Sequence, residues 1–425
     1  MNTRGHRHAR ATAAPPTTRG GSSSKTEGSV TMRGTYSPFP RTEYEHRLAR
    51  IRKVMAAQKL DGLLLTSKEN VVYLSGLQTI GWDSKHRPLG LIVPTEDRMP
   101  VLIVAESLEF VAQESSWIED VRLWGGVRVP GAPADPIVAI QQALRDLRLT
   151  DARVGWELGY GTRLAMPQAD YEALRAALPN MQVVDGSGAL WQVRMVKSPA
   201  EVEAIRQSCA ATSRAFATGF KAIREGMTER ELAGILFREL ASTNYRPGFV
   251  MIRSGRLKYR MINVEPFDKP MERGDLVIVD LGATYKDYWS DFMRMASVGI
   301  PTKEQRAFFD CDLAAQKAGV ATIRPGIPTK AIFQACADVI KEKGFAEHAR
   351  IERVGHGVGL DVHEPPSIAH NSETIVEPGM VLTVEPIFYD RPDGRIGNFA
   401  LEDVVVVTET GHEILSTFPK DLWIA

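Results

Sequence analysis

The chain has 425 residues, of which 44% are hydrophobic and 24% charged, with 52 basic and 52 acidic side chains. A chain of this length exceeds one ordinary hydrophobic core, so two domains are expected. The composition is typical of a globular protein and excludes the disordered and fibrous classes. The balanced charge provides no overall field for nucleic acid or an anionic membrane, and no apolar run approaches the roughly 20 residues that span a bilayer.

Three cysteines, Cys209, Cys311 and Cys336, are too few and too scattered for a disulfide framework or a cysteine-ligated zinc site. Each lies in an apolar stretch of helical character, where a buried free thiol is expected. Because the sequence shows neither a membrane span nor a disulfide framework, we expect a cytoplasmic protein.

Residues 1–35 differ from the rest of the chain, because they are rich in Arg, Ser, Thr, Gly, Pro and Ala and contain a single acidic residue, Glu27. Such a segment buries too little apolar surface to offset its ordering entropy. A basic, acid-poor leader is also typical of a transit peptide. We favour a disordered tail or a start codon placed too early, since Met32 precedes the first foldable segment. Whether residues 1–31 belong to the native protein stays open.

From about Thr42 onward, the sequence alternates between helical and strand-like patterns. Helical spacing of apolar residues covers residues 44–59, 134–147 and 167–178, and strand-like runs cover residues 62–66, 89–93 and 101–105. This alternation predicts a smaller α/β domain over residues 36–190. Residues 193–199 are predicted to connect it to a long helix, with Ser198 as the helix cap and Pro199 in the first turn.

The second half, residues 191–425, contains a weak internal repeat. Residues 220–228 recur one hundred residues later as residues 320–328, and in each copy a helix is predicted to end at a glycine, Gly226 or Gly326. Each copy adjoins a β-rich block. The repeat therefore predicts an α+β domain with pseudo-two-fold symmetry.

A threonine soon after each of these glycines is predicted to start the next helix. In the first copy, Thr228 and Glu231 have the spacing of a capping box. In the second copy, Thr329 is predicted to cap its helix alone.

Two aspartates flank a hairpin-like segment. Asp280 ends an apolar run, and Asp291 lies eleven residues later in the expected returning strand, so a hairpin would place the two carboxylates side by side. Neighbouring buried carboxylates repel each other unless they share a proton or a cation. The structural alternative is that Asp291 pairs with Arg294 while Asp280 caps a turn. This segment alone leaves the two alternatives about even.

A second chemically distinctive segment surrounds His356. Three glycines beside it let the backbone pass close to another group and leave the imidazole little shielding. A lone histidine is more often structural than a ligand, but His363 follows just before a Glu-Pro-Pro sequence that would stiffen the loop. This combination favours metal binding or proton transfer.

Two glutamates, Glu385 and Glu402, lie inside apolar runs that contain few Lys or Arg residues. A carboxylate in a strand core needs a partner of opposite charge, and a cation would serve both. Two ions that shared bridging carboxylates would hold a hydroxide, the nucleophile of two-metal hydrolysis. We therefore expect two divalent metal ions, Mn, Co, Zn or Fe, bound by a hard, oxygen-rich set: Asp280, Asp291, His356, Glu385 and Glu402.

The order of these residues resembles the methionine aminopeptidase, prolidase and aminopeptidase P family, which has the pita-bread fold. The resemblance rests on the two aspartates, the Gly-His-Gly-x-Gly loop, the Val-Glu-Pro around Glu385 and the late Glu402. The run Asn70-Val-Val-Tyr-Leu-Ser-Gly76 is similar to the N-terminal domain of the prolidase and creatinase branch. The resemblance implies a C-terminal pita-bread domain after a creatinase-like α/β domain. It also implies a homodimer in which the N-terminal domain of one subunit narrows the site of the other.

The same resemblance implies roles for individual residues. The five residues above match the family's metal ligands, Glu385 is the candidate proton shuttle, and His363 matches a histidine that contacts substrate and would stabilise the oxyanion. The implied reaction is hydrolysis of a C–N bond in a small amide or short peptide, most commonly an Xaa-Pro peptide.

Two positions depart from the family's pattern. The peptidases usually carry a His seventeen residues before the first aspartate and an Arg two residues before the last glutamate, where this chain has Asn263 and Ala400. Asn cannot become a cation or shuttle a proton. His86, His370 or Arg260 could compensate.

These departures favour an alternative, a non-peptidase member acting on a small metabolite, similar to creatinase, ectoine hydrolase or the dimethylsulfoniopropionate lyases. A third alternative is a non-catalytic binding homologue. Such homologues typically lose metal ligands, whereas this chain retains all five.

Overall fold

The computed structural model describes residues 34–86, 88–242, 245–255, 259, 261, 264–349, 352–389 and 396–425. The tail predicted for residues 1–35 lies outside these residues except for its last two positions. None of the helices within the described ranges is long and apolar enough to cross a membrane.

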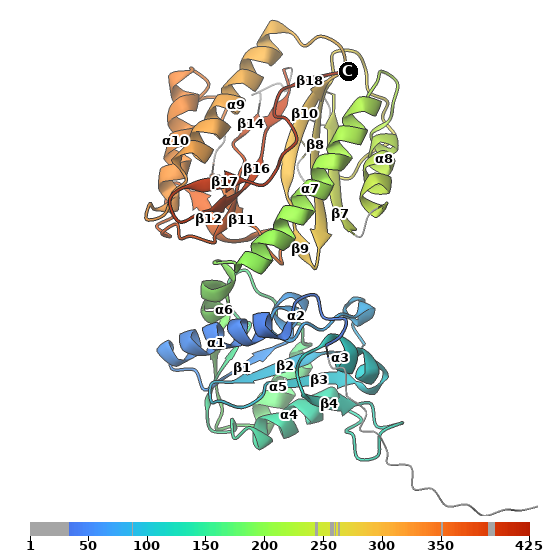
Figure 1. The fold of residues 1–425 in the computed structure, drawn as a ribbon, viewed down its shortest axis with the longest axis vertical. Coiled ribbons are helices and arrows are strands. Elements are labelled where there is room, and N and C mark those ends of the chain that lie inside the picture. Colours follow the sequence, from blue (N-terminus) through green and yellow to red (C-terminus); the bar gives the residue numbers. More distant parts are fainter. Residues whose placement is uncertain are drawn as a thin grey trace, which may run out of the picture. The chain divides into compact units, whose positions relative to one another are not determined.

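The N-terminal part contains one six-stranded mixed sheet (Figure 1). In spatial order the strands are β4 (Asp120–Trp124), β3 (Val101–Ala105), β2 (Gly90–Pro94), β1 (Gly62–Leu65), β5 (Arg153–Trp156) and β6 (Gln182–Asp185). β1 pairs with β2 and β2 with β3 in antiparallel fashion, whereas the β3–β4, β1–β5 and β5–β6 pairs are parallel.

Helices cover both faces of this sheet because alternate strand residues point to opposite sides. Leu63, Leu65 and Val93 share a core with α1, whereas Leu64 and Ile92 share a second core with α4 and α5. The predicted α/β alternation is thus present. The helices are α1 (Arg41–Ala57), α2 (Lys68–Ser75), α3 (Glu109–Ser115), α4 (Pro136–Asp146), α5 (Gln168–Ala177) and α6 (Ser187–Arg194), with 3-10 turns η1 (Ile80–Asp83) and η2 (Glu106–Leu108).

The connection predicted for residues 193–199 is shorter than expected, because α6 continues to Arg194. Its second half is as predicted. Ser198 caps the long helix α7 (Pro199–Ala222) with Pro199 in the first turn, and Glu201 completes a capping box. Ser198 also donates to Glu43 Oε1 of α1 at 2.8 Å, so the cap contacts the N-terminal part.

Among its described residues, the second half contains two five-stranded sheets, one two-stranded sheet and four helices. In Figure 1 the strands lie between the helix pair α7 and α8 (Glu229–Ala241) and the pair α9 (Lys303–Thr322) and α10 (Thr329–Glu342). The first sheet contains β18 (Trp423–Ile424), β10 (Phe292–Ser297), β8 (Leu276–Tyr285) and β7 (Arg246–Ser254), with β9 (Tyr288–Trp289) added to β8.

The second sheet contains β12 (Glu364–Ala369), β11 (Arg353–Gly357), β13 (Val381–Val384), β16 (Asp403–Val407) and β17 (His412–Ile414). A separate two-stranded ladder joins β14 (Ile387–Tyr389) to β15 (Asn398–Ala400).

The weak sequence repeat corresponds to a structural one. Gly226 N donates to Met271 O at 2.8 Å, and its counterpart Gly326 N donates to Val376 O at 2.9 Å. Both glycines have positive φ, +80° and +87°. Each helix ends before its glycine, however, since α7 stops at Ala222 and α9 at Thr322. The glycines reverse the chain after the helices instead of ending them.

The two threonines of the repeat behave differently. Thr228 and Glu231 form the predicted capping box. The prediction that Thr329 caps α10 is wrong, because Pro328 holds the cap position and no side chain caps this end. The Thr329 hydroxyl instead donates to Ser372 Oγ at 2.7 Å, and this tertiary contact takes it away from its own helix.

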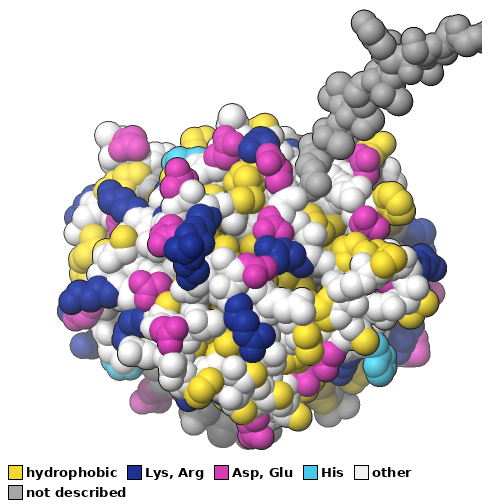
Figure 2. Space-filling view, turned by 90° about the horizontal axis from the view of Figure 1, so that it is seen from below, with side chains coloured by type: hydrophobic (Ala, Val, Ile, Leu, Met, Phe, Trp, Pro, Cys, Tyr) yellow, Lys and Arg dark blue, Asp and Glu magenta, His cyan; other side chains and the backbone are white. Residues whose placement is uncertain are grey.

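Charged side chains of both signs are mixed on the surface. On the face drawn in Figure 2, Lys and Arg side chains are interspersed with Asp and Glu side chains over the described residues. This mixture agrees with the equal numbers of acidic and basic residues in the sequence. It gives this face no extended field of a single sign.

Gly282 on β8 provides a test of this packing. A Cβ at this position would lie 2.6 Å from Ser290 O and would overlap the Phe249 ring. We expect Gly282→Ala to lower the free energy of unfolding by about 1–3 kcal/mol, because neither neighbour can yield without moving a strand. Urea unfolding measures the change.

The matched control is Gly188→Ala in α6, where an added methyl group meets nothing within 4 Å. Helix propensity predicts no loss there and a gain of up to about 1 kcal/mol. Equal unfolding midpoints for Gly282→Ala and the unsubstituted protein would contradict the close approach of β7, β8 and Ser290.

Candidate metal centre

β8 presents Asp280 on the face of the first sheet that points away from helix α7. Val277, Val279 and Leu281 belong to the core that includes α7, and the alternation of a strand turns Asp280 to the opposite side. Asp280 lies within β8, not at its end as the sequence suggested. Its cross-strand neighbour on β10 is Met293, which offers no charge to pair with a carboxylate.

Asp291 follows β9 and directly precedes β10, so the predicted hairpin brings it back beside Asp280. A hydrogen bond from Trp289 N to Gly359 O, 2.8 Å long, ties this hairpin to the loop after His356. This backbone hydrogen bond therefore holds the hairpin that carries Asp280 and Asp291 against the loop that follows β11 of the second sheet.

The second sheet supplies the other three residues. His356 lies in β11, Glu385 directly follows β13 and Glu402 directly precedes β16. β13 and β16 are antiparallel with Val384 opposite Asp403, so the two glutamates are neighbours at the end of this ladder. The glycines around His356 allow the expected close approach, since a Cβ on Gly355 would overlap Thr383 O.

All five predicted residues converge on one small volume. Three groups have ligand atoms that all lie within 4.8 Å of one another: Asp280, Asp291 and Glu402; His356, Glu385 and Glu402; and Asp291, His356 and His363. Asp291, His356 and Glu402 each occur in two groups. Overlapping groups of this kind are what two ions with shared carboxylates require.

The carboxylate oxygens have few protein partners. Asp280 Oδ1 and both carboxylate oxygens of Glu402 are buried without a hydrogen-bond partner among the described residues. Arg353 Nη2 lies 3.8 Å from Glu385 Oε1, but the Arg353 side chain is 46% exposed and its charge is partly screened by water. Buried, unsatisfied oxygens beside an imidazole fit a hard or borderline divalent cation.

Burial and mutual repulsion disfavour the ionised carboxylates. Burial raises the pKa of Asp280 to about 6 and that of Glu385 to about 7. Burial and the neighbouring carboxylates raise the pKa values of Asp291 and Glu402 well above the ordinary range. Without a cation, the cluster would therefore hold protons near neutral pH.

His356 has the tautomer that a metal ligand needs. Its Nδ1 lies 2.9 Å from Gly357 O, and since a carbonyl can only accept, Nδ1 carries the proton. Nε2 lies 3.4 Å from Glu385 Oε1 and 3.6 Å from Asp291 Oδ2. Burial and the nearby His363 lower the pKa of His356 to about 3, so its Nε2 lone pair is free for coordination.

His363 lies at the edge of this centre. Its ring centroid is 4.3 Å from that of His356, and it belongs to one of the three candidate groups. Burial lowers its pKa, so the imidazole is neutral near pH 7. A neutral imidazole retains one N–H that can donate a hydrogen bond.

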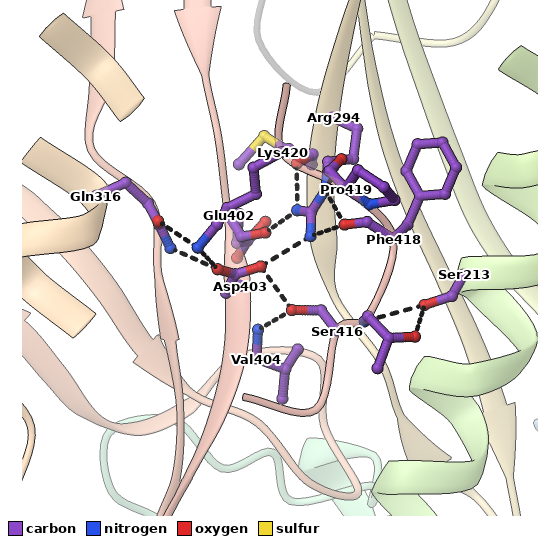
Figure 3. A network of polar contacts seen from close by, with 12 residues as sticks. Ser213, Arg294, Gln316, Glu402, Asp403, Val404, Ser416, Phe418, Pro419 and Lys420 are labelled. Atoms are coloured by element: carbon purple, nitrogen blue, oxygen red, sulfur yellow. Dashed lines mark hydrogen bonds and ion pairs between the residues drawn. The ribbon is translucent and has the colours of Figure 1, made fainter. Parts of the chain in front are cut away.

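A polar network beside the centre was missed in the sequence (Figure 3). Arg294 Nη2 donates to Asp403 Oδ1 at 2.8 Å, and Arg294 Nη1 donates to the Glu402 carbonyl oxygen. Asp403 also accepts from Ser416 Oγ at 2.7 Å and from Lys420 Nζ at 2.6 Å. The structural alternative in which Asp291 pairs with Arg294 is therefore wrong. Arg294 fixes the backbone of Glu402 instead.

The departures from the family's pattern are only partly visible. Ala400 is buried in β15 opposite Ile387, so it brings no charge to the centre. Asn263 and Arg260 lie outside the described residues. His86 and His370 are exposed, and neither belongs to a candidate metal group among the described residues.

Comparison with known proteins accounts for both parts of the chain. Residues 203–409 match the model for metallopeptidase family M24, and residues 47–196 match the creatinase/prolidase N-terminal domain. The chain is 30% identical over 382 residues to the Xaa-Pro dipeptidase of Lactobacillus helveticus, covering 87% of this chain and 99% of that protein. The chain belongs to metallopeptidase family M24. The two matches meet between residues 196 and 203, and the boundary at residue 190 stays a prediction.

Other members of family M24 extend the likeness. The Xaa-Pro dipeptidase of Pyrococcus furiosus is 27% identical over 379 residues, covering 89% of this chain and 99% of that protein. The solved structure of an Xaa-Pro dipeptidase from Bacillus anthracis matches with a TM-score of 0.79 at 26% identity, covering 90% of this chain and all of that one.

These findings confirm the expected α+β pita-bread fold with its creatinase-like N-terminal domain. The resemblance is confirmed for the prolidase branch, and the mention of methionine aminopeptidase was too broad. As a member of family M24, the chain is a hydrolase that works with divalent metal ions.

The assignment of ligands can be tested by metal content. We expect Asp291→Asn to lower the affinity for metal by at least about tenfold, because Asp291 belongs to two overlapping groups. The variant should therefore retain less metal. Elemental analysis of protein loaded with Mn and freed of excess ion measures the stoichiometry. Asp310→Asn, which changes an exposed carboxylate of α9, is the control and should retain the full metal content.

The raised pKa values also predict how stability depends on pH. Folding raises the pKa of Asp280 to about 6 and of Glu385 to about 7, from unfolded values of about 4. Between these limits the metal-free folded state binds more protons than the unfolded state. Its stability therefore falls as the pH rises from about 4 to about 7.

Bound ions would replace those protons, so the loaded protein should lose less stability over the same window and metal binding should release protons. Calorimetric titration with Mn at pH 6.5 in two buffers of different ionisation enthalpy measures the release. Binding without proton release, or equal pH dependence with and without metal, would contradict these shifts.

Proposed function

We propose that the chain hydrolyses the amide bond of short Xaa-Pro peptides at a centre of two divalent ions, Mn, Co, Zn or Fe. The ligands are Asp280, Asp291, His356, Glu385 and Glu402. The supporting observation is their convergence: four buried carboxylates and one imidazole form overlapping groups of three, and the ligand atoms within each group lie within 4.8 Å of one another. The Xaa-Pro dipeptidases of similar sequence align with this chain over 98–99% of their length.

When bound, the ions supply Lewis acidity that activates water and polarises the substrate carbonyl. Glu402 and Asp291 would each help to hold both ions, because each carboxylate belongs to two of the overlapping groups. The Arg294 contact to the Glu402 backbone fixes the chain segment that carries this carboxylate.

Glu385 is assigned to proton transfer in addition to metal binding. Its Oε1 lies 3.4 Å from His356 Nε2, inside the centre, and its relative exposure of 8% leaves an edge open toward substrate. A carboxylate at this position can take a proton from the attacking water and return it to the leaving nitrogen. The Glu385–Arg353 contact of 3.8 Å favours the ionised form that accepts the proton.

His363 is assigned to the oxyanion. Its lowered pKa keeps the imidazole neutral, so an N–H is available to donate to the oxygen that gains charge in the transition state. His363 also lines a cavity of about 530 Å³, together with Ser67, Asn70, Arg163 and Asp361. This volume falls in the range of about 300–1,000 Å³ that is typical of small-ligand sites, so it has room for a short peptide.

One observation favours a second candidate, hydrolysis of a small non-peptide amide. Ala400 is a buried apolar residue where the family's peptidases usually have an arginine, so one cation near the last ligand is missing. A site with less positive charge would bind a peptide carboxylate less well. The two candidates share the metal centre and differ only in substrate.

A substrate panel separates them. Mn- and Zn-loaded protein should hydrolyse Ala-Pro and other Xaa-Pro peptides faster than creatine-like, ectoine-like and other small amides. His363→Ala should reduce kcat on the best substrate by about 10²–10³-fold while metal content stays unchanged. The matched control is His348→Ala. The His348 ring packs on Phe308 of α9, so this variant should leave activity unaltered.

Hydrolysis of the small amides alone would shift the assignment to the second candidate. No hydrolysis of any of these compounds by protein that retains its metal would contradict both. Loss of metal in His363→Ala would show that His363 is a ligand and not an oxyanion donor.

A further inference from the structure

Glu364, the residue after His363, is buried between two cationic side chains and accepts several hydrogen bonds. Its Oε2 accepts from Lys197 Nζ at 3.0 Å, and its Oε1 forms an ion pair with Arg194 Nη2. The side chains of all three residues are at most 3% exposed. Opposite charges buried at this distance hold each other strongly, and removal of one partner leaves the others uncompensated.

The same carboxylate folds the loop that carries His363. Glu364 Oε1 accepts from Leu360 N at 3.0 Å and from Asp361 N at 3.2 Å. Gly359 makes room for this arrangement, since a Cβ there would lie 2.5 Å from Glu364 Oε2. The Glu364 side chain therefore holds the loop of residues 359–364 together by accepting hydrogen bonds from its backbone.

Arg194 contacts residues that precede and follow His363 in the sequence. Its Nη2 also donates to Asp361 Oδ2 at 2.8 Å, so the residues one position after and two positions before His363 are held by one guanidinium group. The guanidinium group stacks on the Trp191 ring at 4.6 Å, within the same helix α6. A planar fork with fixed donor directions orients the groups that it contacts, whereas a lysine ammonium acts as a point charge on a flexible stem.

The other end of Arg194 continues into the N-terminal sheet. Arg194 Nη1 donates to Asn70 Oδ1 at 2.8 Å, and Asn70 Nδ2 donates to Glu157 Oε1 at 2.7 Å. Glu157 in turn accepts from Thr66 N and Ser67 N at 2.6 and 3.0 Å, at the end of β1. All these residues belong to one compact unit, residues 33–425. A continuous polar chain thus joins the N-terminal sheet to the loop beside the metal centre.

We propose that Arg194 and Glu364 are positioning residues for His363, through which the N-terminal domain sets the oxyanion-binding geometry of the metal centre. The proposal rests on the proposed function of His363. Neither Arg194 nor Glu364 belongs to a candidate metal group among the described residues. Their effect is therefore expected to pass through the orientation of the His363 loop. Arg194 also lines the cavity beside His363, so an unchanged KM separates positioning from direct contact with substrate, and an unchanged metal content separates it from metal binding.

The test compares Arg194→Lys and Glu364→Gln in the full, Zn-loaded chain with Ala-Pro as substrate. Lysine keeps the charge but loses the fork, and glutamine keeps the shape but places an amide N–H₂ against a cation. Each variant should lower kcat by about tenfold or more with KM changed by less than about threefold, at unchanged metal content. The matched control is Arg206→Lys on α7. It alters an ion pair with Glu413 at the surface and should leave kcat and KM unchanged.

A double-mutant cycle separates positioning from a general structural effect. In a His363→Ala background, Arg194→Lys should lower kcat by less than about twofold, because the residue through which it acts is already absent. In ¹⁵N-histidine spectra of the Zn-loaded protein, Arg194→Lys should shift the His363 imidazole signals and leave those of the distant His348 unchanged.

Three outcomes overturn the proposal. The first is a normal kcat in both Arg194→Lys and Glu364→Gln. The second is a loss of kcat on Arg194→Lys that is as large in the His363→Ala background as in the unsubstituted protein. The third is a loss of kcat that is proportional to a loss of bound metal. If the unsubstituted enzyme fails to hydrolyse Ala-Pro, the proposed peptidase function fails, and the imidazole spectra still decide whether Arg194 positions His363.

Discussion

Burial of four carboxylates around one imidazole is the constraint on which the rest of the catalytic domain depends. Asp280, Asp291, Glu385 and Glu402 have relative exposures between 1% and 8%, and three of their oxygens have no protein partner among the described residues. Burial disfavours the ionised forms and raises their pKa values, and neighbouring carboxylates add to this at Asp291, Glu385 and Glu402. A divalent cation removes that penalty. The donors come from two separate sheets, so the ions would also join the two halves of the domain.

The surroundings of the centre divide into two supporting systems with different tasks. Arg294 and Asp403 lie behind Glu402 and hold its backbone, so they maintain the ligand geometry (Figure 3). Arg194 and Glu364 lie behind His363 and link it to the N-terminal sheet. A dipeptidase needs its metal pair fixed and its substrate groups placed relative to that pair. The two systems share no residue.

The sequence was most informative where charge conflicts with a local pattern. A carboxylate in an apolar strand run, as at Asp280 or Glu402, predicts a shared cation because no local partner exists. The tertiary partners could not be predicted, since Arg294 and Asp403 are 109 residues apart and Arg194 and Glu364 are 170 apart. Thr329 failed as a cap for the same reason: its hydroxyl bonds to Ser372, far along the chain. Local rules predicted the candidate ligands, whereas the residues that support them depend on the assembled fold.

Anomalous diffraction from a crystal of the Mn-loaded protein tests the two-metal assignment. Two peaks at the Mn edge, separated by about 3.5–4 Å, are expected among Asp280, Asp291, His356, Glu385 and Glu402. Absence of ordered metal among these five residues, or occupation of a site elsewhere with the carboxylates hydrogen-bonded to one another, would contradict it.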